Sequence, residues 1–119
     1  MKGENRMASE KKAAWVVFKM DKEMTTAEWR ERFSGAYELM YNLPGIFSKC
    51  WWVNQEKGEW GALYVFDSEE KLQLYLTSEL WVKIVPEKFG CKPEVTILEP
   101  GPIISKDQIS KAEGSWLTT

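Results

Sequence analysis

Two neighbouring apolar segments constrain this chain more than any other part of its sequence. They cover residues 46–56 and 59–67 and are separated by a Lys57-Gly58 turn, which predicts an antiparallel hairpin. A hairpin with one face in water alternates apolar and polar residues, but residues 50–53 and 62–66 are continuously apolar. Both faces are therefore expected to be buried. A chain of 119 residues can cover one face with its own helices, and we expect a second copy to cover the other.

The segments around the hairpin supply two helices and two further strands. Residues 13–20 and 95–98 are predicted strands. Thr25 and Glu28 form a capping box that begins a helix, and Pro44-Gly45 ends it. A second helix begins at Asp67 or Ser68, and a helical piece over residues 81–89 continues it, broken near Pro86. The order β-α-β-β-α-β predicts an α+β, ferredoxin-like fold with a four-stranded antiparallel sheet in the order 4-1-3-2.

The chain reads as a single domain with an extension at each end. Residues 1–12 are polar and are predicted to be a flexible leader, residues 13–99 the α+β domain, and residues 100–119 a C-terminal arm. The arm carries Ile103, Ile104 and Ile109, which need an apolar surface to pack against. We expect this surface to belong to the partner subunit of a homodimer.

Composition excludes several functional classes. The chain has no histidine, which excludes a serine–histidine triad, a histidine-ligated haem and most transition-metal sites. Cys50 and Cys91 fall near opposite edges of the predicted sheet, which favours reduced thiols. The net charge of −2 and the dispersed basic residues argue against nucleic-acid binding. No signal core or segment of about 20 apolar residues is present, so we expect a cytoplasmic protein. The missing histidine and the two distant cysteines predict that it holds no transition metal.

The turn determines which hairpin side chains share a face. A loop of two or four residues centred on Lys57-Gly58 pairs residues whose numbers add up to 115. Trp51 then lies opposite Tyr64. One face then carries Lys49, Trp51, Val53, Ala62, Tyr64 and Phe66. The other face carries Cys50, Trp52, Asn54, Gly61, Leu63 and Val65.

Lys49, Trp51 and Tyr64 form the candidate catalytic constellation. Tyr64 could donate a hydrogen bond to a phenol or an enolate, and Trp51 could stack on an aromatic ring. Lys49 could stabilise an oxyanion or, when desolvated, act as a base. Tyr37 could reach the same pocket from the first helix. The alternative is that Trp51 and Tyr64 are a cross-strand core pair, that Tyr37 is core packing, and that Lys49 extends into solvent.

Several short motifs resemble those of the YdhR-like monooxygenases, which belong to the dimeric α/β-barrel superfamily. The resemblance covers about residues 13–111 and is clearest between Leu43 and Leu76. It rests on Pro44-Gly45, Lys49-Cys50-Trp51, the segment Glu59–Phe66, Tyr75-Leu76 and Glu99-Pro100. It implies two ferredoxin-like subunits with their sheets face to face, and a small-molecule pocket between helices and sheet. Trp52 and Asn54 match, by type alone, pocket residues of cofactor-free members; alternatively, Asn54 simply begins the turn.

The resemblance implies a cofactor-independent monooxygenase, or a related small enzyme, acting on an aromatic or polyketide-like molecule. Two alternatives remain open: a dimeric, non-enzymatic binding module for an apolar ligand, and a cyclase or isomerase on the same fold. A ligand-sized cavity beside Trp51 or Trp52 would favour a small-molecule site, whereas a pocket filled by side chains would favour a non-enzymatic or structural role.

Overall fold

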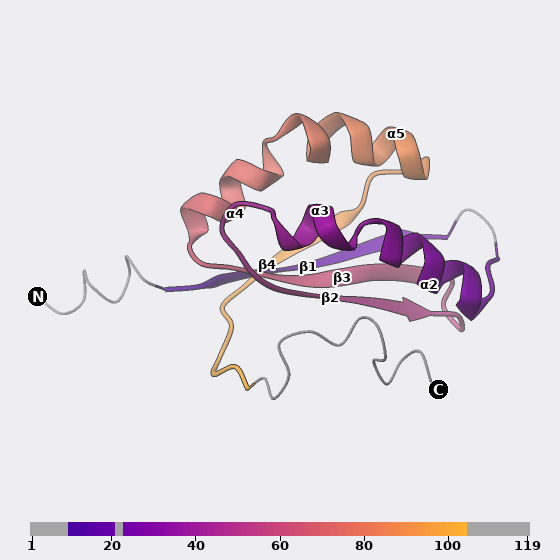
Figure 1. The fold of residues 1–119 in the computed structure, drawn as a ribbon, viewed down its shortest axis with the longest axis horizontal. Helices are drawn as coiled ribbons and strands as arrows, with labels where there is room; N and C mark the ends of the chain where they lie inside the picture. The colour runs from indigo at the N-terminus through magenta and orange to yellow at the C-terminus, as the bar shows by residue number, and fades with distance from the viewer. Residues whose placement is uncertain (1–9, 21–22, 105–119) are drawn as a thin grey trace, which may run out of the picture.

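One sheet covered by helices on a single face forms the architecture of this chain (Figure 1). The computed structural model describes residues 10–20 and 23–104. The elements in chain order are β1 (Lys12–Lys19), α2 (Thr26–Gly35), α3 (Tyr37–Tyr41), β2 (Ile46–Asn54), β3 (Glu59–Phe66), α4 (Glu69–Leu76), the π-helix η1 (Leu80–Ile84), α5 (Val85–Phe89) and β4 (Glu94–Leu98).

The sheet confirms the predicted ferredoxin-like topology. Its strands lie in the order β2-β3-β1-β4, and every neighbouring pair is antiparallel. The helices of both crossovers lie on the same face (Figure 1). The predicted leader and arm lie mostly outside the described residues, and their packing stays a prediction. No described helix has the length and apolar character needed to cross a membrane.

The first predicted helix begins as expected but is interrupted. Thr25 Oγ1 accepts a hydrogen bond from the Glu28 amide at 3.2 Å, and Glu28 Oε1 accepts one from the Thr25 amide at 2.7 Å, which completes the capping box. At Ala36 the amide bonds to the Phe33 carbonyl three residues back, and the helix divides into α2 and α3. Gly35 immediately before this point lowers helix stability, which makes it a favourable place for the break.

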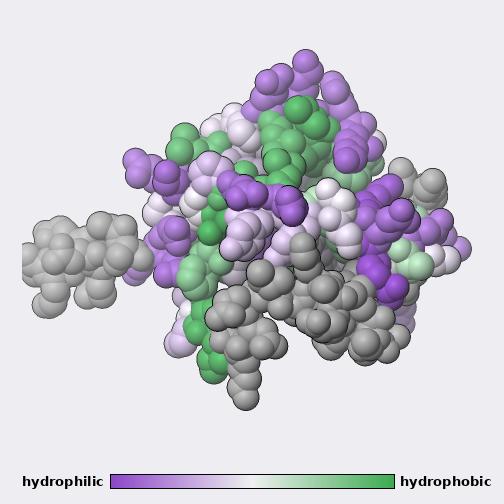
Figure 2. All heavy atoms as spheres, viewed as in Figure 1, coloured by the Kyte–Doolittle hydropathy of each residue, from purple (hydrophilic) through white to green (hydrophobic). Residues whose placement is uncertain are grey.

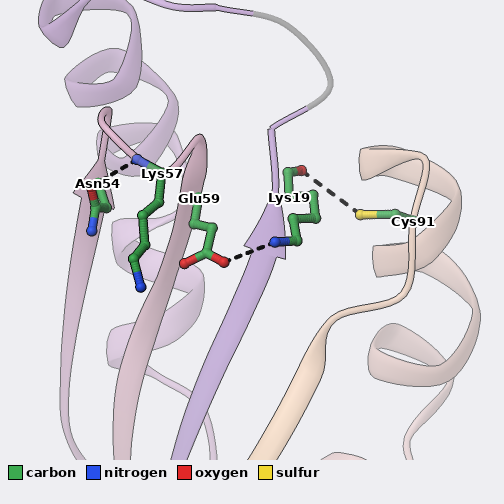
Figure 3. A network of polar contacts seen from close by, with 5 residues as sticks. All are labelled: Lys19, Asn54, Lys57, Glu59 and Cys91. Carbon is green, nitrogen blue, oxygen red and sulfur yellow. Dashed lines mark hydrogen bonds and ion pairs between the residues drawn. The ribbon is translucent and has the colours of Figure 1, made fainter.

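The predicted hairpin register is wrong by two residues. Lys49 pairs with Tyr64, and Trp51 pairs with Ala62. The numbers of two paired residues therefore add up to 113 rather than to the predicted 115. The loop consists of residues 55–58, because Asn54 Oδ1 accepts a hydrogen bond from the Lys57 amide at 3.1 Å and begins the turn earlier (Figure 3). A shift by an even number leaves every side chain on its predicted face.

The core lies between the sheet and the helices. Seven strand residues with little exposure face the helices: Ala14, Val16, Phe18, Trp60, Ala62, Tyr64 and Phe66. Six helical residues pack onto them: Trp29, Phe33, Met40, Leu72, Tyr75 and Trp81. β3 is the central contributor, and one position on it must be glycine. A Cβ on Gly61 would lie 1.8 Å from the Val16 carbonyl oxygen.

The opposite sheet face also carries large apolar side chains. Trp15 of β1 stacks on Trp52 of β2 with ring centroids 5.0 Å apart, and Trp15 remains 39% exposed. Cys50 lies on the β2 edge, while Cys91 lies beside the end of β1, where its thiol donates to the Lys19 carbonyl at 3.9 Å (Figure 3). Each cysteine is a free thiol. The prediction that a second copy covers this face is not tested by a single chain.

Candidate functional site

A cavity of about 280 Å³ opens between the helices and the sheet. This size is near the lower end of the roughly 300–1,000 Å³ range of small-molecule pockets. Its floor is formed by β1, β2 and β3, and its walls come from α2, α3, α4, η1 and α5. Apolar and aromatic side chains dominate the lining, and they include Phe18, Phe33, Met40, Trp51, Trp60, Leu80, Trp81, Val85 and Phe89.

A chain of three polar groups lies in one part of this cavity. Lys49 Nζ donates a hydrogen bond to the Tyr64 hydroxyl at 3.0 Å. The Tyr64 hydroxyl lies 3.3 Å from the Tyr75 hydroxyl, and either oxygen can be the donor. Cross-strand pairing of Lys49 with Tyr64 brings the first two groups together. Tyr75 reaches them from the buried side of α4. The arrangement forms a short path along which a proton can move.

Burial determines the charge states of Lys49, Tyr64 and Tyr75. Desolvation lowers the pKa of the Lys49 amine to about 7, because no water solvates the ammonium form fully. Desolvation also raises the pKa of Tyr64 well above its usual value, with a further contribution from Tyr75, and it raises the pKa of Tyr75. Near neutral pH the site therefore holds two neutral phenols and an amine close to half-protonated.

Aromatic rings fix the position of the Lys49 amine. Its Nζ lies 4.4 Å from the ring centroid of Trp51 and 4.3 Å from that of Tyr64. Trp51 in turn stacks on Phe33 of α2 at 5.5 Å with an interplanar angle of 12°. Ring faces attract a cation without neutralising it. The rings therefore hold the amine at the cavity wall, but they do not cancel the free-energy cost of burying its positive charge.

The π-helix η1 forms the wall opposite the sheet. Single π-turns are rare and are often found at functional sites. This one begins after Ser78, whose Oγ accepts from the Trp81 amide at 3.3 Å. It directs Trp81 against Tyr64 in an edge-to-face contact of 6.2 Å and places Ile84 on the cavity lining. Figure 2 shows hydrophobic atoms gathered over this helical region.

The structure brings together three of the predicted site residues and separates three others. Lys49, Trp51 and Tyr64 line the cavity. Trp52 lies on the opposite sheet face against Trp15. Asn54 is occupied in the β2–β3 turn (Figure 3). The sixth, Tyr37, stacks on Tyr41 at 6.0 Å and is not part of the cavity lining. The ligand-binding role predicted for these last three gains no support from this cavity.

Sequence reasoning missed several residues that the cavity contains. Tyr75 enters the sequence analysis only as part of the Tyr75-Leu76 motif, although a hydroxyl within an apolar helix face signals a buried hydrogen-bond partner. Trp81 was assigned only to a helical piece, and the π-turn that directs it inward has no recognised sequence pattern. Arg32 and Lys88 also line the cavity, and nothing in their local sequence marks them.

Within the described residues, no three His, Cys, Asp or Glu side chains lie close enough together to hold a metal ion. Among the described residues, no Asp or Glu lines the cavity. The polar side chains that line it are those of lysine, arginine and tyrosine, which donate hydrogen bonds and suit the recognition of phenols and anions.

Comparison with known families places residues 15–95, well over half of the chain, in the family described as "Putative mono-oxygenase ydhR". The protein belongs to this family. The match includes the hairpin and both crossovers, which are the segments that build the cavity. A comparison with curated protein sequences finds no match.

Solved structures share the fold at low sequence identity. A Nitrosomonas europaea protein of unknown function superposes with a TM-score of 0.63 at 15% identity, over 83% of this chain and 97% of that one. A Streptomyces coelicolor monooxygenase from ActVA-Orf6, in complex with nanaomycin D, gives a TM-score of 0.61 at 15% identity, covering 84% and 96%. A variant of SnoaB, a cofactor-independent oxygenase from Streptomyces nogalater, gives 0.58 at 10% identity, covering 82% and 99%.

Proposed function

We propose that this protein is a cofactor-independent monooxygenase that acts on a small aromatic phenol or its enol-forming ketone. The observation that carries the proposal is the Lys49 amine, 3.0 Å from the Tyr64 hydroxyl at the wall of an apolar cavity. An amine whose pKa is near 7 is an effective base at neutral pH. The neutral Tyr64 and Tyr75 hydroxyls can donate hydrogen bonds to the anion that forms.

The proposed reaction begins with a proton transfer. Lys49 takes the hydroxyl proton of a phenol or enol, and the resulting anion passes one electron to dioxygen. The two radicals recombine as a peroxide at the ring carbon, and loss of water leaves a carbonyl group. For a ring methylene the balance is CH₂ + O₂ → C=O + H₂O, in which the substrate supplies all four electrons. The residues bind and orient the substrate, accept a proton and stabilise the anion.

The relatives support this proposal without deciding it. One structure of the same fold is described as a cofactor-independent oxygenase, and another is a monooxygenase with nanaomycin D bound. These descriptions belong to those proteins. For this chain we also propose a cytoplasmic homodimer that binds an apolar or aromatic ligand and needs no metal or cofactor, since the substrate itself reduces dioxygen.

Anthrone is a suitable test substrate because its enol is a phenol and its oxidation product absorbs visibly. We expect oxygen uptake above the rate of uncatalysed oxidation, with one dioxygen consumed per anthraquinone formed. Lys49→Met should reduce kcat at least about 10²-fold, the lower range for removal of a catalytic base. Lys57→Met, on the exposed turn of the same hairpin, is the matched control and should keep full activity.

Two results would contradict the proposal. Oxygen uptake that never exceeds the uncatalysed rate with anthrone or with hydroquinones would favour a binding module. Product formation without oxygen consumption would favour a cyclase or isomerase.

A further inference from the structure

The charged side chains that line the cavity all have the same sign. Arg32, Lys49 and Lys88 line it, and no aspartate or glutamate of the part of the chain that the structure describes does so. Arg32 is half-buried and Lys88 is exposed, so these two cations face both the cavity and solvent, where they can pair with an anionic group of a ligand. The lining therefore selects for a ligand that carries negative charge.

Two of these cations lie beside the same aromatic ring. The Arg32 guanidinium carbon is 5.3 Å from the ring centroid of Phe89, and Lys88 Nζ is 5.8 Å from the same centroid. Arg32 comes from α2 and Lys88 from α5, so the tertiary fold places both beside Phe89. Among the described residues, no carboxylate forms an ion pair with either side chain.

The third cation lies at the other end of the cavity. Phe89 packs against Trp60 with centroids 4.8 Å apart, whereas Lys49 bonds to Tyr64. Trp60 and Tyr64 are four residues apart on β3 and share a face. At a rise of about 3.3 Å per residue this separates the two positions by roughly 13 Å. An apolar floor that includes Trp51 and Ala62 lies between them.

We propose that the cavity binds an elongated aromatic acid. Its carboxylate lies between Arg32 and Lys88, its fused rings cover the apolar floor, and its hydroxyl reaches Lys49 and Tyr64 at the opposite end. The inference that this acid is also the substrate rests on the proposed monooxygenase function. The inference that the cavity binds this acid does not depend on that function.

Arg32 has a packing role that the test must separate from ligand binding. Its guanidinium also lies 5.4 Å from the ring centroid of Trp29, and such stacking contributes to stability by itself. A variant that loses the charge also loses this stacking. The measurement must therefore compare charged and neutral ligands on the same variant.

Three probes of equal size make that comparison. The first is 6-hydroxy-2-naphthoate, which has its hydroxyl and carboxylate at opposite ends of two fused rings. The second is 6-hydroxy-2-naphthamide, which is neutral and has the same shape. The third is 1-hydroxy-2-naphthoate, whose two groups are adjacent and cannot span the cavity. Titration calorimetry with the full chain should show the first binding at least about tenfold more tightly than either of the others, since a hydrogen bond to a charged group favours binding by that order.

The variants locate the carboxylate. Arg32→Gln combined with Lys88→Gln should bring the naphthoate-to-naphthamide affinity ratio close to one while leaving naphthamide affinity nearly unchanged. Arg32→Lys, which retains the charge, should keep most of the preference. Lys83→Gln is the matched control, because Lys83 is exposed on η1 and does not line the cavity; its ratio should equal that of the natural chain.

Three outcomes would overturn the inference: equal affinity of the natural chain for naphthoate and naphthamide, a preference that survives in the double variant, or no naphthoate binding at millimolar concentration. The proposed function fails separately. Oxygen uptake from neutral anthrone without any carboxylate preference would contradict only the anion site. A carboxylate preference without oxygen uptake from any phenol would contradict only the monooxygenase.

Discussion

Lys49 is the residue on which the proposed chemistry depends most directly. Its amine is held by two aromatic rings and one hydroxyl, and none of these groups carries a negative charge near neutral pH. An amine in water would be protonated at every physiological pH. Here desolvation alone brings its pKa to about 7, so the fold places a titrating base where the sequence has no histidine.

The pH dependence of turnover follows from this pKa. A base acts only when deprotonated, so kcat/KM for anthrone should rise with pH, reach half its maximum near about pH 7, and remain level above it. The measurement is initial rate against pH, corrected for uncatalysed oxidation. A profile that is flat between about pH 6 and 9 would remove Lys49 as the base.

Stability should depend on the same group. The folded-state pKa lies below the value of 10.5 for an unperturbed lysine, so between about 7 and 10.5 the unfolded chain binds more protons and stability rises with pH. Lys49→Met should therefore raise the melting temperature most near about pH 6, where the buried ammonium costs on the order of 2–4 kcal/mol. Thermal unfolding of both proteins should show the gap narrowing toward pH 10.

Tyr64 can be tested by removing only its hydroxyl. Tyr64→Phe retains the ring that contacts Phe66 and Trp81, and the lost hydrogen bonds should cost about 1 kcal/mol of stability. Turnover should fall about 10²-fold if the hydroxyl stabilises a developing oxyanion. Trp51→Phe, the comparison variant, should mainly raise KM because it shortens the stacking surface. Turnover at the natural level in Tyr64→Phe would leave that residue with a packing role only.

At the scale of the elements, β1 and β3 approach each other closely at Gly61. Gly61 allows this approach because a Cβ would meet the Val16 carbonyl at 1.8 Å and the Trp52 ring at 2.9 Å. Gly61→Ala should therefore destabilise the chain by about 3 kcal/mol or more, since the clash is with backbone. Denaturant unfolding measures this directly.

Gly35→Ala is the matched control for that experiment. Gly35 ends α2, and a Cβ there would meet nothing within 4 Å. The substitution should be neutral or should stabilise the chain by about 0.5–1 kcal/mol, because alanine loses less entropy in a helix. A Gly61→Ala protein as stable as the Gly35→Ala protein would show that the two strands can separate without cost.

At the scale of the whole molecule, the sheet face that lacks helices predicts a second subunit. Trp15 is 39% exposed there and Leu98 is 40% exposed, and large exposed apolar patches mark interaction sites. Light scattering at micromolar concentration should give about 28 kDa, twice the 13.8 kDa mass of the chain. Trp15→Glu should shift the dimer toward monomer by at least about tenfold in dissociation constant.

A matched variant tests whether that loss is specific to the sheet face. Val82 is 58% exposed on η1, on the helical side of the molecule, and Val82→Glu should leave the dimer intact. A chain that remains monomeric at micromolar concentration without any substitution would contradict the paired-sheet arrangement.

Local sequence determined the elements of this protein and their order. Two helices begin at signals whose groups are only a few residues apart: the Thr25–Glu28 capping box and the acidic first turn after Ser68. The start of each helix therefore needs no tertiary contact. The apolar runs of β1 and β3 fixed the sheet order, since right-handed crossovers leave one arrangement for a β-α-β-β-α-β chain. The shared face of Lys49, Trp51 and Tyr64 was predictable for a similar reason, because side chains on a strand alternate.

Tertiary structure decided the register, the break in the first helix and the composition of the cavity. The register depends on where the turn begins, and in the structure Asn54 begins it. The run of apolar residues does not show this, because it is compatible with a turn centred one residue later. Tyr75, Trp81, Arg32 and Lys88 meet Lys49 around one cavity although they come from four separate helical segments. Their proximity arises because the helices must cover the same sheet face, and a contact set by the packing of distant segments leaves no trace in the local sequence of any one of them.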